Sequence, residues 1–305
     1  MATEKTVTTA ATAEAPVKKV RRGVSNQTQL SRIKFHEKDA AANGLFVGHL
    51  DSVTVEWSKS EKMFNGLSCP RLTFYFESNH QNKAERRLVS KTLFPVASNV
   101  DTIPGGKDAG QVDNVFKWIK HFLDVYYLNG RQLTEEEEDL LSLPFVDYDE
   151  HFQYVPVEPE DVLAGYGTLF TNVAAIFNGT AKPLADGETP KPCYKTDNGG
   201  IIPVWIKLLR HYKGRDGWRD VTNGDLAFSN YVGGGAIERQ KPNTNPVVLR
   251  IDQSKESITP KETKRQPTMG GTNILGMGGV MTDPTAQSPI GDMNAYADAA
   301  EGMPF

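Results

Sequence analysis

The hydrophobic period changes twice along the chain, and this constrains the fold more than any other feature. Residues 46–57 and 72–76 alternate between apolar and polar side chains, which is typical of strands with one buried face. Residues 112–126 instead repeat apolar side chains every three or four positions, which is typical of an amphipathic helix. Strand patterns return near residue 202. The order of strands, helices and further strands predicts an α+β fold that is mainly β.

Turn residues and caps place the predicted elements. Three strands are expected, over residues 46–57, 71–77 and 87–96. A helical insertion, about residues 111–180, is expected to hold helices over 112–126, 134–143 and 159–177; Thr134 and Glu137 form a capping-box pattern. Further strands are expected over residues 202–212, 226–237 and 246–251. Alternation assigns one face of the first strand to Val47, His49, Asp51, Val53, Val55 and Trp57, and the other to Leu50, Ser52 and Thr54.

Composition favours one sizeable core with appendages, since 38% of the 305 residues are hydrophobic. We expect a disordered basic arm over residues 1–40, a folded core over 41–252 and a disordered Gly/Met-rich acidic tail over 253–305. No apolar run approaches the roughly 18 to 20 residues needed to cross a bilayer, so no membrane association is expected. Two isolated cysteines, Cys69 and Cys193, favour reduced thiols in a cytoplasm.

The net charge of −4 hides a strong asymmetry between segments. Residues 1–35 contain seven Lys/Arg against two acids, whereas residues 135–161 contain eleven acids and no Lys/Arg. The acids at 135–138 radiate around a helix instead of converging on one point. We therefore interpret the acidic segment as a solvated face that repels nucleic acid.

The sequence contains none of the common catalytic motifs. It has no GxxxxGK[ST] loop, no HExxH, no GxSxG and no strand-linked GxGxxG. Its histidines are scattered and show no metal-ligand spacing. We expect no enzymatic activity, no cofactor and no metal.

The segment 205–219 mixes aromatic and basic residues: Trp205, Lys207, Arg210, Tyr212, Lys213, Arg215, Trp218 and Arg219. Single-stranded nucleic acid is bound by this mixture, because cations follow the phosphates while flat rings stack on unpaired bases. The surface could extend over Arg71, Tyr75, Arg86, Arg87 and Lys91. An alternative stays open, in which Trp205 and Tyr212 are core residues and the charges lie at a strand edge.

Strands, a helical segment and further strands also match the order of an OB-fold, a small Greek-key barrel. The chain closes with glycines at 270–279, spaced acids and no Lys/Arg after residue 265, and a final Met303-Pro304-Phe305. This resembles the C-terminal tail of bacterial and phage single-stranded DNA-binding proteins. The resemblance implies an OB-like Greek-key barrel and a tail that docks on partner proteins through Asp298, Glu301, Met303, Pro304 and Phe305.

The chain departs from the bacterial pattern in its spaced acids, its larger core and its helical insertion, which favours a bacteriophage version in the host bacterial cytoplasm. The leading hypothesis is therefore a protein of DNA replication, recombination and repair that binds single-stranded DNA without sequence preference and recruits replication or recombination proteins. A bacteriophage virion or assembly protein is the alternative. A nuclease ranks last, because the acidic segment has no neighbouring cations in sequence. Oligomeric state and DNA versus RNA preference stay open.

Overall fold

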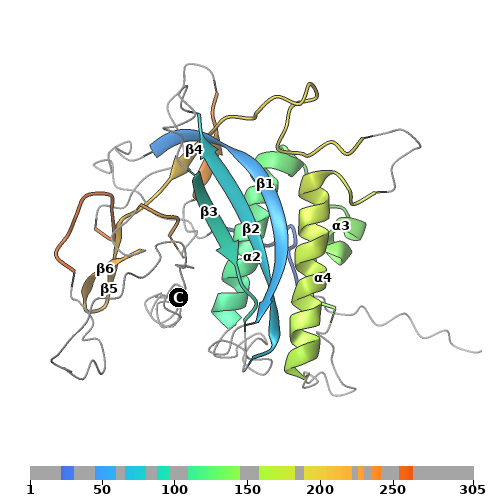
Figure 1. The fold of residues 1–305 in the computed structure, drawn as a ribbon, viewed down its shortest axis with the longest axis horizontal. Coiled ribbons are helices and arrows are strands. Elements are labelled where there is room, and N and C mark those ends of the chain that lie inside the picture. Colours follow the sequence, from blue (N-terminus) through green and yellow to red (C-terminus); the bar gives the residue numbers. More distant parts are fainter. Residues whose placement is uncertain are drawn as a thin grey trace, which may run out of the picture.

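The computed structural model describes residues 22–30, 45–59, 66–79, 88–96, 109–144, 158–182, 189–221, 226–229, 235–241 and 254–263. These residues form a five-stranded sheet, helices packed against it and a small three-stranded sheet to one side (Figure 1). All the strand pairs in both sheets are antiparallel. The expected mixture of helices with antiparallel strands is confirmed.

The large sheet is built on a meander of β1 (Leu45–Lys59), β2 (Ser68–Ser78) and β3 (Leu88–Leu93). After the helices, β4 (Val204–Lys207) returns to pair with β1, and β7 (Ile237–Arg239) adds beyond it. A fourth strand that returns by a long connection to lie beside the first is the Greek-key arrangement. The sheet formed by the described strands is open, in the order β3-β2-β1-β4-β7, and does not close into a barrel.

The helices pack on one face of this sheet. They are α2 (Ala109–Leu123), which continues as the π-helical segment η2 (Asp124–Leu128), then α3 (Glu135–Leu140) and α4 (Pro159–Asn178). Phe74 of β2 contacts Phe122 of α2 and Phe177 of α4, with ring centroids 4.5 and 5.2 Å apart. Because one strand residue touches both long helices, α2 and α4 share a face of the sheet.

Local sequence explains where the helices begin and end. At α3, the Thr134 hydroxyl accepts from the Glu137 backbone N–H while the Glu137 carboxylate accepts from the Thr134 N–H, so the predicted capping box is confirmed. Helix α4 ends at Gly179, which has a φ of 72° that glycine adopts without strain. The sequence predicted both boundaries because cap residues act within a few positions of the helix end.

The predicted faces of β1 are wrong beyond residue 50 because the strand contains a bulge. Leu50 pairs with Phe76 and Ser52 with Tyr75, which leaves Asp51 as an extra residue. Leu50 and Val53 are consequently both buried on the helix face, although strict alternation would separate them. His49 and Ser52 therefore lie on the opposite face, on which none of the described helices packs. It is called the outer face below.

The C-terminal half differs from the prediction because part of it forms a second, small sheet. It consists of β5 (His211–Gly214), β6 (Gly217–Asp220) and β8 (Glu256–Ser257), in the order β6-β5-β8. The single strand expected over 202–212 is thus two strands in two sheets. Strand β8 also lies within the segment expected to be a disordered tail, so folded structure extends past residue 252.

Part of the expected N-terminal arm is folded as well. Val24 is 1% exposed, and its backbone N–H donates to the carbonyl of Leu141 at the end of α3. Residues 1–21, the strand expected over 246–251 and the tail after residue 263 lie outside the described residues. Both cysteines, Cys69 and Cys193, are free thiols.

None of the helices in the described part of the chain has the length and apolar character needed to span a membrane.

Candidate nucleic-acid interface

The aromatic and basic residues of segment 205–219 do not form one surface. Trp205 and Lys207 belong to β4 of the large sheet, whereas Tyr212, Lys213, Trp218 and Arg219 belong to β5 and β6 of the small sheet. Arg210 lies in the connection between the sheets and is half-buried. The residues of this segment therefore do not share one surface, because the chain leaves one sheet and enters another between residues 207 and 211.

Lys207 is buried between the two sheets and offers no charge at the surface. Its side chain is 3% exposed, and its Nζ lies 3.4 Å from the carboxylate of Glu256, which is 8% exposed. A buried lysine needs such a partner, since an unpaired charge away from water is strongly destabilising. The pair links β4 to β8. Its acidic member comes from the segment that composition alone assigns to the tail, so no local pattern reveals it.

Lys91 is also buried, which removes it from the predicted binding surface. It lies on the helix face of β3, where Nζ is 4.4 Å from the ring centroid of Trp118 and donates to the carbonyl oxygen of Ser229 at 3.2 Å. Burial lowers the pKa of the Lys91 ammonium from 10.5 to about 7. Alternation along β3 places this lysine between core residues Val89 and Leu93.

Three predicted residues remain on the outer face of the large sheet. Tyr75 and Trp205 are half-buried there, and the Trp205 indole N–H makes no hydrogen bond to any described residue. Arg71 is also on this face, where it forms a half-exposed ion pair of 3.2 Å with Glu56 on β1. Tyr75 pairs with Ser52 and Trp205 with Val47, so the two rings lie on opposite sides of β1 and well separated along it.

The hairpin of β5 and β6 brings together the largest share of the predicted cluster. Its two-residue turn, Arg215-Asp216, is closed by Gly217 at a φ of 124°, which a side chain would strain. Lys213 is directly opposite Trp218, and Tyr212 is directly opposite Arg219. Because successive strand residues point to opposite faces, each face of the hairpin carries one ring beside one cation.

Trp218 has the more basic surroundings. In addition to Lys213 opposite it, Lys261 from the segment after β8 places its Nζ 5.6 Å from the centroid of the indole ring. Lys213, Arg215 and Lys261 are exposed. The acids of the hairpin contact other groups: Asp216 forms an ion pair of 3.3 Å with Arg219, and Asp220 lies 2.8 Å from His211 Nδ1. The Trp218 side of the hairpin therefore presents a half-buried ring among exposed cations.

Several predicted residues lie outside the described part of the chain. They are Arg86, Arg87, Asp298, Glu301, Met303, Pro304 and Phe305.

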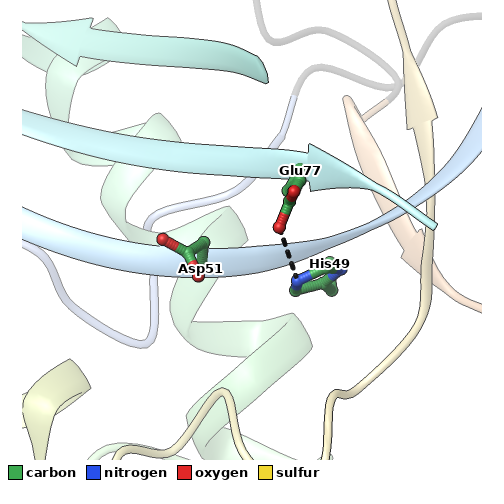
Figure 2. Close-up of side chains that lie close together, drawn as sticks. All are labelled: His49, Asp51 and Glu77. Carbon is green, nitrogen blue, oxygen red and sulfur yellow. Dashed lines mark ion pairs between the residues drawn. The ribbon is translucent and has the colours of Figure 1, made fainter. Parts of the chain in front are cut away.

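A second group of polar residues lies on the outer face and was missed by the sequence analysis. His49 and Asp51 come from β1 and Glu77 from β2, and one ligand atom of each lies within 4.8 Å of the others. Figure 2 shows the Glu77 carboxylate reaching across to His49 while Asp51 lies beside them on β1. The only sequence signal is the His49–Asp51 spacing of two, which is too common to identify a site without the position of β2.

Comparisons with known proteins give no family or fold assignment: no protein-family model, curated protein or solved structure matches this chain. Its functional interpretation therefore depends on the geometry of its own residues.

Proposed function

We propose that this protein binds single-stranded DNA without sequence preference, in replication, recombination or repair. The observation that carries the proposal is the group around Trp218, in which one ring lies opposite Lys213 and beneath Lys261. This revised surface is smaller than the one expected from sequence. It consists of the β5–β6 hairpin and Lys261, and we refer to it as the hairpin surface.

The hairpin surface has the two properties that unpaired DNA requires. A base can stack on the Trp218 ring, and stacking of this kind contributes about 1–3 kcal/mol per base. Phosphates on either side of that base can meet the exposed Lys213, Arg215 and Lys261. Neither contact depends on base identity, which accounts for the proposed lack of sequence preference.

The outer face of the large sheet offers a second stretch of the same binding path. OB-folds are partly open Greek-key barrels that bind oligonucleotides on the face of strands 2 and 3. Here β1 pairs with both β2 and β4, and the helices come between β3 and β4. This order supports an OB-like relationship, in an open form, and Tyr75 and Arg71 of β2 lie on the corresponding outer face.

The proposed partner contact uses the end of the chain. The Phe305 ring would enter an apolar pocket on a replication or recombination protein, while the acids Asp298 and Glu301 meet basic residues at the rim. The resemblance to tails of single-stranded DNA-binding proteins supports this role. A variant without residues 296–305 is expected to bind DNA as well as or better than the full chain while losing the partner contact.

Fluorescence anisotropy with a labelled oligo-dT tests the proposal. The full-length protein should bind at low ionic strength, with affinity that falls as salt rises. Trp218→Ala should weaken binding, whereas Trp57→Phe should not, because Trp57 is an exposed ring on the helix side of β1 beside Gly167 of α4. Absence of salt-sensitive binding would overturn the proposal and favour the virion or assembly protein instead. If the Trp218→Ala and Trp57→Phe variants bound oligo-dT equally well, the hairpin surface would not be the DNA-binding surface.

A further inference from the structure

We propose that His49, Asp51 and Glu77 form a binding site for one divalent transition-metal cation of the Mn²⁺ or Zn²⁺ type. The three side chains supply one imidazole nitrogen and two carboxylates, a mixture of ligands that both ions accept. The proposal does not rest on DNA binding, because a metal ion alone tests it. None of its residues belongs to the hairpin surface, and the site shares the outer face with Arg71 and Tyr75.

The ligand atoms are close to the spacing that a metal ion needs. His49 and Glu77 are cross-strand partners, and Nε2 of the histidine lies 3.7 Å from an Oε of the glutamate. Neighbouring ligands of a tetrahedral ion with bonds of ~2.1 Å are about 3.4 Å apart. The three ligand atoms all lie within 4.8 Å of one another. A small change in the side-chain torsion angles of the exposed Asp51 would therefore bring its carboxylate to bonding distance of the same ion.

The imidazole is oriented as metal-binding histidines usually are. Its Nδ1 lies 2.6 Å from Oδ1 of Asn79, and since an amide oxygen can only accept, Nδ1 carries the proton and donates. Nε2 then presents its lone pair on the side of Glu77, whose carboxylate oxygen lies 3.7 Å away. A hydrogen bond of this kind from the second ring nitrogen fixes the tautomer and the ring angle of a ligating histidine. The ring is also 5% exposed, which holds it in place.

Asp51 lies at the β1 bulge. Because Leu50 and Val53 both occupy the core, the two residues between them are left outside it, and Asp51 has no partner on β2. Bulges are enriched beside active sites, where they redirect a side chain. A regular strand would place residue 52, a serine, on the same face as Leu50 and pair Asp51 with Tyr75. Regular alternation would also place Asp51 on the face of His49; the bulge leaves this carboxylate there without a β2 residue opposite it.

Isothermal titration of untagged, metal-free protein with MnCl₂ and with ZnCl₂ tests the site. We expect one equivalent of at least one ion to bind, and Asp51→Asn and Glu77→Gln each to weaken its binding at least tenfold. Both changes keep side-chain size, and Asp51 is exposed, so Asp51→Asn should not affect folding. Glu56→Gln is the matched control, because Glu56 is an exposed carboxylate on the same strand.

Asn79→Ala separates a metal site from a simple ion pair. Loss of the hydrogen bond to Nδ1 should weaken metal binding by about 10- to 100-fold, as for other residues that orient ligands. Absence of binding by the wild-type protein, or equal binding by the wild type, Asp51→Asn and Glu77→Gln, would overturn the proposal and leave His49–Glu77 as a structural contact.

Discussion

Two lysine–tryptophan pairs in this protein combine the same residue types but differ in burial. Lys91 lies over Trp118 in the core, where the two residues are 5% and 1% exposed. Lys261 lies over Trp218 at the small sheet, where the lysine is exposed and the ring is half-buried. The first pair fills space between β3 and α2, and the second is accessible to a ligand. Residue type alone therefore does not distinguish a packing contact from a binding surface.

The largest expected effect concerns the buried charges that join the two sheets. Glu256→Gln should destabilise the protein by about 3–5 kcal/mol, because it removes the carboxylate charge 3.4 Å from the buried Lys207 ammonium. Chemical denaturation measures this. Replacing both residues by methionine should restore most of the loss, since burial of apolar groups needs no partner. If the single and double variants were equally unstable, the ion pair would not be the cause.

A second prediction uses the pH dependence of the Lys91 pair. The folded-state pKa is lowered from 10.5 to about 7, so between these values the unfolded chain binds a proton that the folded protein has lost. Stability should consequently rise with pH there, by up to about 1.4 kcal/mol per pH unit. The measurement is the difference in unfolding free energy between wild type and Lys91→Met from pH 7 to 9. Subtracting the two free energies cancels the contribution that other titrating groups make to the pH dependence. One of these groups is Cys69, whose pKa is raised by burial to about 12.

A substitution in the exposed Lys261–Trp218 pair is expected to weaken DNA binding without impairing folding. Trp218→Ala should reduce affinity for oligo-dT by about 1–3 kcal/mol, or roughly 5- to 150-fold, through loss of stacking. Trp118→Phe is the contrasting change, since it alters a core ring and should lower the melting temperature with unchanged affinity. The reverse result would show that accessibility does not determine which of the two tryptophans binds DNA.

Lys213→Ala should have a smaller effect that depends on salt. Loss of one phosphate contact lowers the slope of log affinity against log salt by about 0.7 for single strands. Anisotropy titrations at several salt concentrations measure the slope. Lys195→Ala is a useful control, because Lys195 is a lysine next to an aromatic ring, 5.6 Å from that of Tyr194, outside the hairpin surface. A slope that changes equally in both variants would indicate a diffuse charge effect.

The smallest effect is expected at the ion pair on the outer face. Arg71→Ala removes a contact to Glu56 at a half-exposed position, which contributes at most about 1 kcal/mol to stability. Its effect on oligo-dT binding decides whether the outer face belongs to the binding path. A drop in affinity similar to that of Lys213→Ala would include this face, whereas unchanged affinity would confine binding to the hairpin surface.

The helices were predictable because their signals are local. The three- and four-residue period of α2, the Thr134–Glu137 capping box and the glycine after α4 each act within one or two turns. The strand order was predictable in outline for the same reason. The faces of β1 were not, because a bulge at Asp51 is set by pairing with β2 and leaves no distinct mark in the sequence.

The candidate interface was predictable in composition and not in arrangement. Rings and cations that are neighbours in segment 205–219 were divided between two sheets by a break of three residues. Lys207 found its partner, Glu256, 49 positions away, and Glu77 came opposite His49 across a hairpin. Contacts between residues distant in sequence depend on how elements pack, which no local pattern encodes.

Taken by itself, the sequence determined the succession of three strands, three helices and further strands, the positions of the helix caps and the presence of an aromatic, basic segment. Periodicity and caps express short-range hydrogen bonding and steric preference, so they can be read from neighbouring residues. The tertiary structure alone decided which lysines are buried, which tryptophan is accessible and which histidine meets two carboxylates. Those outcomes follow from burial and cross-strand pairing, and both depend on the whole sheet.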